Sequence, residues 1–265
     1  MPDNRAKLYH ASSSYYSMIA RYAIELSGLT YESHLLDIHQ KREQLRPWYV
    51  AINPAMTVPT LVIPEKTLCS SLEILDYALA NCPDRWFEPH ASDAQAQAIE
   101  QLLQAHDRFA VERLTFNAIM QKLPPVRILF PKLLRKTCKD LEALLQRDPV
   151  DADAIRAKLS LNQQRLAYFS EPLHKRQAAQ LAMARDFIAG FPSGPQAQWL
   201  FGGLPSRADV VLLVFLARLN AIGLNNTDLV PSGLTAWFEH KAETVEFLQA
   251  DVWLKFNIWR LLTHR

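Results

Sequence analysis

Cysteine is scarce in this sequence, and its spacing argues against two kinds of site. The three cysteines, Cys69, Cys82 and Cys138, show neither the spacing of metal ligands nor a paired disulfide framework. We therefore expect no metal site, and a reducing cytoplasmic compartment is the default. The polar residues 1–7 lead directly into a strand-like segment, which leaves no room for the apolar region of a secretory signal peptide.

Long hydrophobic runs and a strong charge imbalance are also missing. The longest apolar run covers residues 210–217, far fewer than the roughly 20 residues that a membrane-spanning helix needs. The formal net charge of +2 gives no strong case for nucleic acid or for acidic partners. With 49% hydrophobic residues in a chain of 265, the sequence predicts a soluble protein of one large or two ordinary domains.

Strand and helix signals alternate over the first eighty residues. Short strand-like segments cover residues 7–10, 31–37, 60–63 and 66–69. Helical spacing covers residues 17–27, ended by Gly28, and residues 71–81. The order β-α-β, a connecting segment and then β-β-α is typical of a small mixed sheet with helices on its faces.

An amphipathic helical pattern replaces the strand signals from about residue 93 onward. We expect one long helix over residues 94–120, a break at Pro124 and Pro125, and further helices over residues 133–146 and 151–188. The predicted organisation has three parts: residues 1–83, a linker over residues 84–92, and an all-helical part over residues 93–265.

A proline stands at the start of the third predicted strand, directly after Val58. Because Pro59 cannot donate to a sheet ladder, it belongs at a strand start or at an edge. If the bond between the two residues is cis, the turn leaves the backbone N–H and C=O of Val58 free to pair with an extended ligand. The helix that opens at Ser70 and Ser71 offers hydroxyls and unpaired N–H groups, which favour a carboxylate. Both features suit a peptide-like, anionic ligand.

Another serine-led helix start precedes the apolar run of residues 210–217. Ser206 and Asp209 have the spacing of a capping box, in which each side chain bonds to the other residue's backbone. We interpret this box as a folding device at the start of a core helix rather than as a catalytic group.

The motifs together resemble the cytosolic glutathione transferase family, which has a thioredoxin-like half followed by an all-helical half. The resemblance rests on Asn53-Pro54 with Val58-Pro59, the Ser70-Ser71 helix start, Ser14-Tyr15-Tyr16-Ser17 with Arg21, and the Ser206 box. It implies a thioredoxin-like βαβ-ββα domain that binds glutathione, followed by an all-helical substrate-binding domain. The long helical region between Pro124 and Gly190 is similar in placement to that of the tetrachlorohydroquinone dehalogenase and ganglioside-induced differentiation-associated branches.

The resemblance implies a serine-type enzyme in which the Ser14 hydroxyl donates a hydrogen bond to the glutathione sulfur. Such a bond favours the thiolate over the thiol, whose ordinary pKa is about 8.5. Because Ser14 and Ser17 occupy both cysteine positions of a Cys-x-x-Cys motif, disulfide oxidoreductase chemistry is excluded. A capping role for Ser14 shares the same geometry, and the hydroxyls of residues 9, 12, 13, 15 and 16 leave the identity of the thiol contact open.

Tyr16 separates this chain from two branches of the family. The reductive dehalogenase and maleylacetoacetate isomerase branches place a cysteine there, and the dehalogenase needs it to resolve a mixed disulfide. Thiol-mediated dehalogenation is therefore disfavoured, and the isomerase hypothesis loses a supporting residue. Addition or substitution by glutathione on a small hydrophobic electrophile remains, as in detoxification.

The resemblance also assigns the contacts of glutathione. The backbone of Val58, next to Pro59, would bind the cysteinyl part, and Ser71, which follows Ser70, would bind the γ-glutamyl carboxylate. Ser70 replaces an acidic residue that is common in the family, and Met56 replaces the usual glycine. Both departures lower the glutathione affinity that we expect.

The glycyl carboxylate of glutathione needs a donor from residues 39–48. The side chains available there are Lys41, Arg42, Gln44 and Arg46. We take Gln44 as the candidate contact, although charged residues on such a loop are more often simply solvated.

The second substrate should lie between the two halves. The candidate pocket residues are Tyr15, Tyr16, His106, Phe109 and Arg113. The last three share roughly one helix face with Phe116, and the alternative interpretation places most of the aromatic rings in the core. Residues 252–260 form a basic amphipathic tail for which packing on the helical domain is favoured over binding to a membrane surface.

The sequence leaves two functional hypotheses, an enzyme and a binding protein. The first is a homodimeric, cytoplasmic glutathione transferase with glutathione as co-substrate. The second is a non-catalytic binding or scaffold protein that keeps the fold and has lost turnover.

Overall fold

The computed structural model describes residues 6–147, 151–225 and 228–256. Its first part contains a four-stranded sheet with the order β2-β1-β3-β4. The strands are β1 (Lys7–His10), β2 (Glu32–Leu35), β3 (Thr60–Ile63) and β4 (Lys66–Leu68). β1 is parallel to β2 and antiparallel to β3, and β4 is antiparallel to β3. The predicted small mixed sheet is confirmed.

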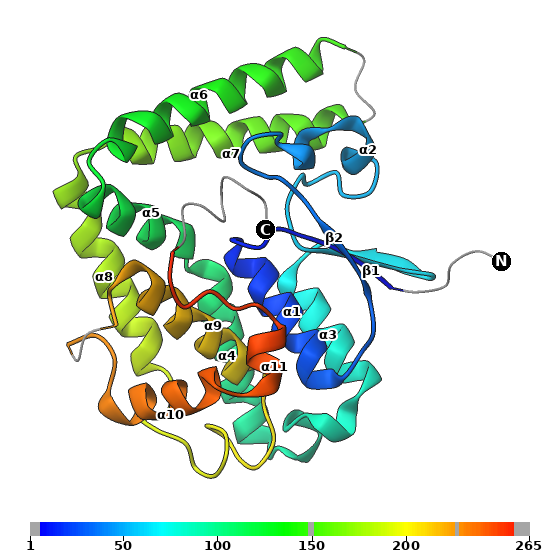
Figure 1. Cartoon of the computed structure of the whole chain (residues 1–265), viewed down its shortest axis with the longest axis vertical. Helices are drawn as coiled ribbons and strands as arrows, with labels where there is room; N and C mark the ends of the chain where they lie inside the picture. The colour runs from blue at the N-terminus through cyan, green and yellow to red at the C-terminus, as the bar shows by residue number, and fades with distance from the viewer. Residues whose placement is uncertain (1–5, 148–150, 226–227, 257–265) are drawn as a thin grey trace.

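Helices α1 (Tyr15–Ser27) and α3 (Ser71–Asn81) lie side by side on one face of this sheet (Figure 1). The side chains that face the sheet form one apolar cluster with it, namely Leu8, Ala20, Ile24, Leu61, Ile63, Leu68 and Ile74. Each element thus buries one apolar side at its own helical or strand period. α1 ends at Gly28, whose φ of 65° is the left-handed conformation that terminates many helices.

A buried asparagine braces the loop that leads into β3. Asn53 is fully buried, and its amide donates to the carbonyl of Thr57 at 3.1 Å and to the hydroxyl of Thr60 at 2.8 Å. The peptide bond between Val58 and Pro59 is cis. The hydrogen bonds of Asn53 thus tie this loop to the first residue of β3.

Helices make up most of the second part of the chain. They are α4 (Asp93–Arg108), α5 (Val111–Lys122), α6 (Val126–Leu145), α7 (Ala152–Ser170), α8 (Leu173–Ala189), α9 (Arg207–Ile222), α10 (Ser232–Ala242) and α11 (Val245–Gln249). Two short 3-10 helices, η2 (Pro83–Arg85) and η3 (Glu88–His90), connect α3 to α4. A thioredoxin-like part followed by an all-helical part is the fold class that the sequence predicts. No helix within the described ranges is both long and apolar enough to cross a bilayer.

The prediction of a single helix over residues 94–120 is wrong. α4 ends at Arg108 and α5 begins at Val111, with a break between them. Phe109 leaves the helical conformation, with ψ at 106°, where its ring packs in the core against Phe187. Neither glycine nor proline marks this break, so the apolar pattern gave no sign of it.

Two further helix bounds also differ from the prediction. The stretch over residues 151–188 is two helices, α7 and α8, which separate at Pro172. The helix predicted over residues 133–146 begins earlier, at Val126, and carries Pro131 inside it. Pro131 is the sixth residue of this helix, so the carbonyl of Arg127 receives no N–H from it, and the helix nevertheless continues to Leu145.

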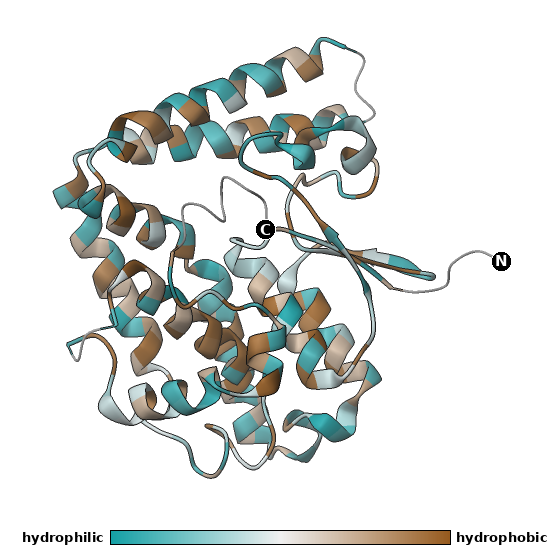
Figure 2. Ribbon diagram, viewed as in Figure 1, coloured by the Kyte–Doolittle hydropathy of each residue, from teal (hydrophilic) through white to brown (hydrophobic). Residues whose placement is uncertain are grey.

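α9 occupies the centre of the core, where Figure 2 shows apolar residues concentrated on it and on its neighbours. Thirteen of its 16 residues are buried, as expected of a helix enclosed on all sides. Ser206 caps it and Asp209 completes the reciprocal bonds, which confirms the predicted capping box. α9 packs against α1, α4 and α5, so it joins the two parts of the molecule.

α6 and α7 form a long hairpin that reaches across to α2 (Pro47–Val50) (Figure 1). Leu141 and Ile155 of the hairpin pack on an apolar patch of the β2–β3 connection, formed by Leu45, Val50 and Met56. Arg42 and Asp140 add an ion pair across the same contact. Met56 has a φ of 53°, a conformation that favours glycine, and its side chain is 1% exposed. The hairpin is therefore anchored to the sheet half.

Candidate functional site

A cavity of about 340 Å³ lies between the sheet half and the helical half. Its lining comes from the start of α1, the β2–α2 connection, the loop before β3, α5, α6, α7 and α9. Ser14, Tyr15, Tyr16, Gln44 and Val58 are the predicted site residues that line it. Three elements of the sheet half and four helices of the helical half thus meet around one space.

Ser14 is the N-cap of α1, and its side chain faces this cavity. Its Oγ accepts a hydrogen bond from the backbone N–H of Ser17 at 3.3 Å. The hydrogen of the Ser14 hydroxyl has no acceptor among the described residues. Ser14 therefore caps the helix and keeps a donor that is available to a ligand in the cavity.

The neighbouring serines are placed differently. Ser13 also lines the cavity, but its hydroxyl bonds to Nε2 of His39 at 2.9 Å. Ser12 lies outside the lining, and its carbonyl accepts from Arg21. Of the three, Ser14 is thus the one that lines the cavity and whose hydroxyl has no side-chain partner among the described residues.

The tyrosines near this site are held neutral. The hydroxyl of Tyr15 bonds to Nε2 of His106 at 3.0 Å, and burial raises the pKa of Tyr15 well above its ordinary value. Burial also lowers the pKa of His106 to about 4. Tyr16 is half-buried, and burial raises its pKa too. A tyrosinate is therefore disfavoured near neutral pH, and His106 acts as a neutral partner of Tyr15.

Val58 presents an unpaired stretch of backbone to the cavity. Its N–H and C=O make no hydrogen bond with the described residues, because β3 begins two residues later at Thr60. Pro59 lies behind it and does not contribute to the lining. An extended ligand could pair with Val58 as an additional antiparallel strand does.

The start of α3 satisfies some of its own backbone N–H groups. Ser70 and Glu73 form a capping box, in which Oε2 of Glu73 accepts from the N–H groups of Cys69 and Ser70 at 2.7 and 3.1 Å. The Ser70 hydroxyl accepts from the N–H of Glu73 at 3.1 Å. The N–H groups of Ser71 and Leu72 remain without an acceptor in the described part of the chain. Ser70 and Ser71 lie outside the lining of the cavity.

Gln44 stands at the cavity wall, in the 3-10 helix η1 (Glu43–Leu45). Its Nε2 donates to the carbonyl of Ile38 at 3.3 Å, and its buried Oε1 has no partner among the described residues. Arg42 lines the same wall and is paired with Asp140.

Three predicted pocket residues lie outside the lining. Phe109 is 3% exposed and packs among other phenylalanines of the core, and His106 is 1% exposed. Arg113 lies over the ring of Tyr168, 4.5 Å from its centroid. Phe116, one turn further along α5, does line the cavity. Phe109 lies in the break between α4 and α5, so it does not share a helix face with Phe116.

Four cationic side chains line the cavity among the described residues, and the sequence analysis had proposed none of them for the second substrate. They are Arg42, Lys158, Arg165 and Arg218. Lys158, Asn162 and Arg165 follow the i, i+4, i+7 spacing of one helix face on α7, a signal that the sequence already contained. Arg218 was visible as the one charged residue in the apolar part of α9 that follows Asp209.

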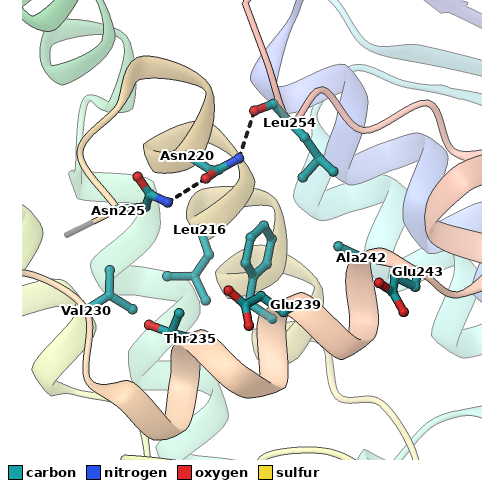
Figure 3. A pocket seen from close by; sticks show the side chains of 10 residues that line it. Leu216, Asn220, Asn225, Val230, Thr235, Glu239, Ala242, Glu243 and Leu254 are labelled. Atoms are coloured by element: carbon teal, nitrogen blue, oxygen red, sulfur yellow. Dashed lines mark hydrogen bonds between the residues drawn. The ribbon is translucent and has the colours of Figure 1, made fainter. Parts of the chain in front are cut away.

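A second pocket of about 300 Å³ lies between α9 and α10 (Figure 3). Asn220 donates to the carbonyl of Leu254 at 2.9 Å, and Asn225 donates to the side chain of Asn220. Glu239 and Glu243 supply two carboxylates, and no cation is among its described lining residues. None of the predicted site residues lines this pocket, and its charge is opposite to that of the first cavity.

Comparison with known proteins places this site in a known fold. Residues 8–86 match the family model of the glutathione S-transferase N-terminal domain. Glutathione transferase E6 from Drosophila melanogaster is 19% identical, with 93% of this chain and 91% of that chain covered at a TM-score of 0.61. A theta class glutathione S-transferase from Xanthomonas axonopodis pv. citri, solved with glutathione bound, is 19% identical, with 93% and 97% covered at 0.56. A bacterial maleyl pyruvate isomerase of the zeta class is 21% identical, with 92% and 95% covered at 0.56. These similarities establish the glutathione transferase fold.

Proposed function

We propose that this protein is a glutathione transferase in which Ser14 activates the thiol of glutathione. The observation that carries the proposal is the uncommitted hydroxyl hydrogen of Ser14 in a cavity that the Val58 backbone also lines. The match of residues 8–86 and the glutathione bound in a similar structure support glutathione as the co-substrate.

The cysteinyl part of glutathione pairs with the backbone N–H and C=O of Val58, and Pro59 fixes the turn behind it. This pairing directs the sulfur toward the N-terminus of α1, where the helix dipole favours negative charge. There the hydroxyl of Ser14 donates a hydrogen bond to the sulfur and stabilises the thiolate.

The two carboxylates of glutathione lie on opposite sides of this sulfur. The γ-glutamyl carboxylate accepts from the N–H groups of Ser71 and Leu72 at the start of α3, beside the capping residue Ser70. The glycyl carboxylate lies toward Gln44, where Arg42 adds positive charge.

In the chemical step the thiolate attacks an electrophilic carbon of the second substrate. A carbon–sulfur bond forms, the leaving group departs with its bonding pair, and the proton of the thiol passes to solvent. Tyr15 and Tyr16 shape the cavity beside the sulfur, and Phe116 takes the place of Phe109 and Arg113 as a contact for the substrate. We expect a cytoplasmic homodimer, as the resemblance implies.

A non-catalytic protein with the same fold is the second candidate, and one observation favours it. Glu73 already occupies N–H groups at the start of α3, so its carboxylate repels the γ-glutamyl carboxylate that would bind next to it. The dehalogenase and isomerase alternatives stay disfavoured, because Tyr16 supplies no thiol.

Titration calorimetry with glutathione separates these candidates. We expect binding with a dissociation constant in the range of about 0.1 to 1 mM, followed by turnover of an activated aryl chloride. Absence of binding at several millimolar would reject glutathione as the ligand, and binding without turnover of any aryl halide would favour the non-catalytic protein.

A further inference from the structure

One end of the cavity is built by single faces of three helices. α5 contributes Phe116, α6 contributes Phe130 and Leu134, and α7 contributes Lys158 and Arg165. The aromatic and aliphatic side chains stand on α5 and α6, whereas the cations stand on α7. Apolar side chains of α5 and α6 and cationic side chains of α7 therefore line the same space.

Two of the four cations in the lining are neutralised by neighbouring carboxylates. Arg165 forms a two-point ion pair with Glu112, which is the one acid in the described lining, and Arg42 pairs with Asp140. Lys158 and Arg218 form no ion pair with any described residue. The cavity therefore holds two positive charges without a counter-charge in the described part of the protein.

Arg218 comes from the core helix α9 and is 6% exposed. Its Nη2 donates to the carbonyl of Ser13 at 2.9 Å, and its guanidinium lies 5.9 Å from the ring centroid of Tyr15. A carbonyl and a ring face compensate a buried guanidinium only in part, since a buried charge normally requires an opposite charge. Burial accordingly lowers the pKa of Arg218 to about 10.

Lys158 stands half-buried on α7, and burial lowers the pKa of its ammonium group to about 8. No described carboxylate faces it to reverse this effect. An anion in the cavity would supply the missing charge for both Lys158 and Arg218.

We propose that the second substrate of the cavity carries an acid group, a carboxylate or a similar anion, on an apolar or aromatic body. The acid group binds Lys158 and Arg218, and the body packs on Phe116, Phe130 and Leu134. This inference rests on the proposed transferase function and replaces a purely hydrophobic electrophile by an anionic one.

A pair of aryl chlorides tests the charge directly. In 4-chloro-3,5-dinitrobenzoate and 4-chloro-3,5-dinitrobenzamide, glutathione displaces the same chloride: a carbon–sulfur bond forms, chloride leaves, and the thiol proton goes to solvent. We expect kcat/KM, divided by the uncatalysed rate constant of each compound, to be about tenfold or more higher for the carboxylate. Equal corrected values for the two compounds would overturn the proposal.

Two matched lysine variants locate the effect. We expect Lys158→Met to lose most of the preference for the carboxylate aryl chloride, chiefly because KM for that compound rises. Its kcat/KM with the amide should fall far less. Lys139→Met is the control, because Lys139 is exposed on α6 outside the cavity and its loss changes the net charge equally. If Lys158→Met instead raises KM for glutathione and leaves the preference intact, the cation serves a glutathione carboxylate and the proposal fails.

A binding measurement separates this inference from the proposed function. 3,5-Dinitrobenzoate lacks the leaving group, so its calorimetric titration needs no glutathione and no turnover. We expect it to bind about tenfold more tightly than 3,5-dinitrobenzamide, and to lose that margin in Lys158→Met. If the protein binds glutathione and binds both dinitro compounds equally tightly, the anion site is refuted and the proposed transferase function is not. If the protein binds 3,5-dinitrobenzoate selectively but does not bind glutathione, the anion site stands and the proposed transferase function is refuted.

Discussion

α1 and α9 both begin after a serine N-cap, yet the two serines have opposite surroundings. At α9, Ser206 and Asp209 are fully buried and satisfy one another, and Asp209 also accepts from the N–H of Leu200 at 2.8 Å. At α1, the residue three positions after Ser14 is Ser17, whose hydroxyl accepts from Ala11 rather than from Ser14. In these two helices, the residue three positions after the N-cap decides whether the hydroxyl hydrogen of the capping serine has an acceptor or stays available.

The largest effect is expected at the cap of α9, where Asp209 accepts the hydroxyl hydrogen of Ser206. Asp209→Ala leaves the buried N–H groups of Leu200 and Ser206 without an acceptor, so we expect the free energy of unfolding to fall by about 4 kcal/mol. Urea denaturation followed by circular dichroism measures this. Asp209→Asn is the matched control, because it keeps one acceptor and should cost about half as much. A loss below about 1 kcal/mol would show that the two caps are energetically alike.

The second largest effect is expected at the cap of α1, Ser14, and it concerns activity rather than stability. Ser14→Ala removes the donor to the sulfur, so kcat/KM with the carboxylate aryl chloride should fall about 100-fold. The free energy of unfolding should fall by about 1 kcal/mol or less, because the lost cap is half-exposed.

Ser13→Ala is the control for this variant, since its hydroxyl bonds to His39 and not to the ligand. The pKa of the bound thiol, read from the thiolate absorbance, should rise toward about 8.5 in Ser14→Ala only. A Ser14→Ala protein with unchanged activity and unchanged thiol pKa would remove Ser14 from the mechanism.

The smallest effect is expected at α3, which starts with an exposed box of Ser70 and Glu73. Glu73→Ala should cost about 0.5 to 1 kcal/mol of unfolding free energy. It should also tighten glutathione binding about twofold, because it removes a negative charge beside the γ-glutamyl carboxylate. Glu73→Gln keeps the box and removes the charge, so it should tighten binding without loss of stability. Weaker glutathione binding in Glu73→Gln would contradict this arrangement of the site.

Local signals account for the parts that the sequence predicted well. The strand Thr60–Ile63 and the helix Ser71–Asn81 were predicted with the bounds that they have, because a proline and two serines mark their starts. The capping box at Ser206 is equally local, since both partners lie within one turn.

Tertiary packing decided the parts that the sequence did not predict. Phe109 interrupts a helical pattern only because the core has room for its ring beside Phe187. Lys158 and Arg165 belong to a helix that looked merely charged, and they face the cavity because α7 packs on α6. Their shared face was visible as a spacing, but which neighbour it would meet depends on the folded arrangement.

Because the α6–α7 hairpin packs on Met56, the sequences of the two halves of the protein depend on one another at this contact. Leu141 and Ile155 in one half fit a methionine in the other, and that methionine holds a backbone conformation that glycine would adopt more easily. A chimera that takes its first half from a relative with glycine at this position would lose a buried side chain, at a cost of about 2 to 5 kcal/mol. The halves of this protein are therefore matched parts, and recombination must exchange both sides of this contact together.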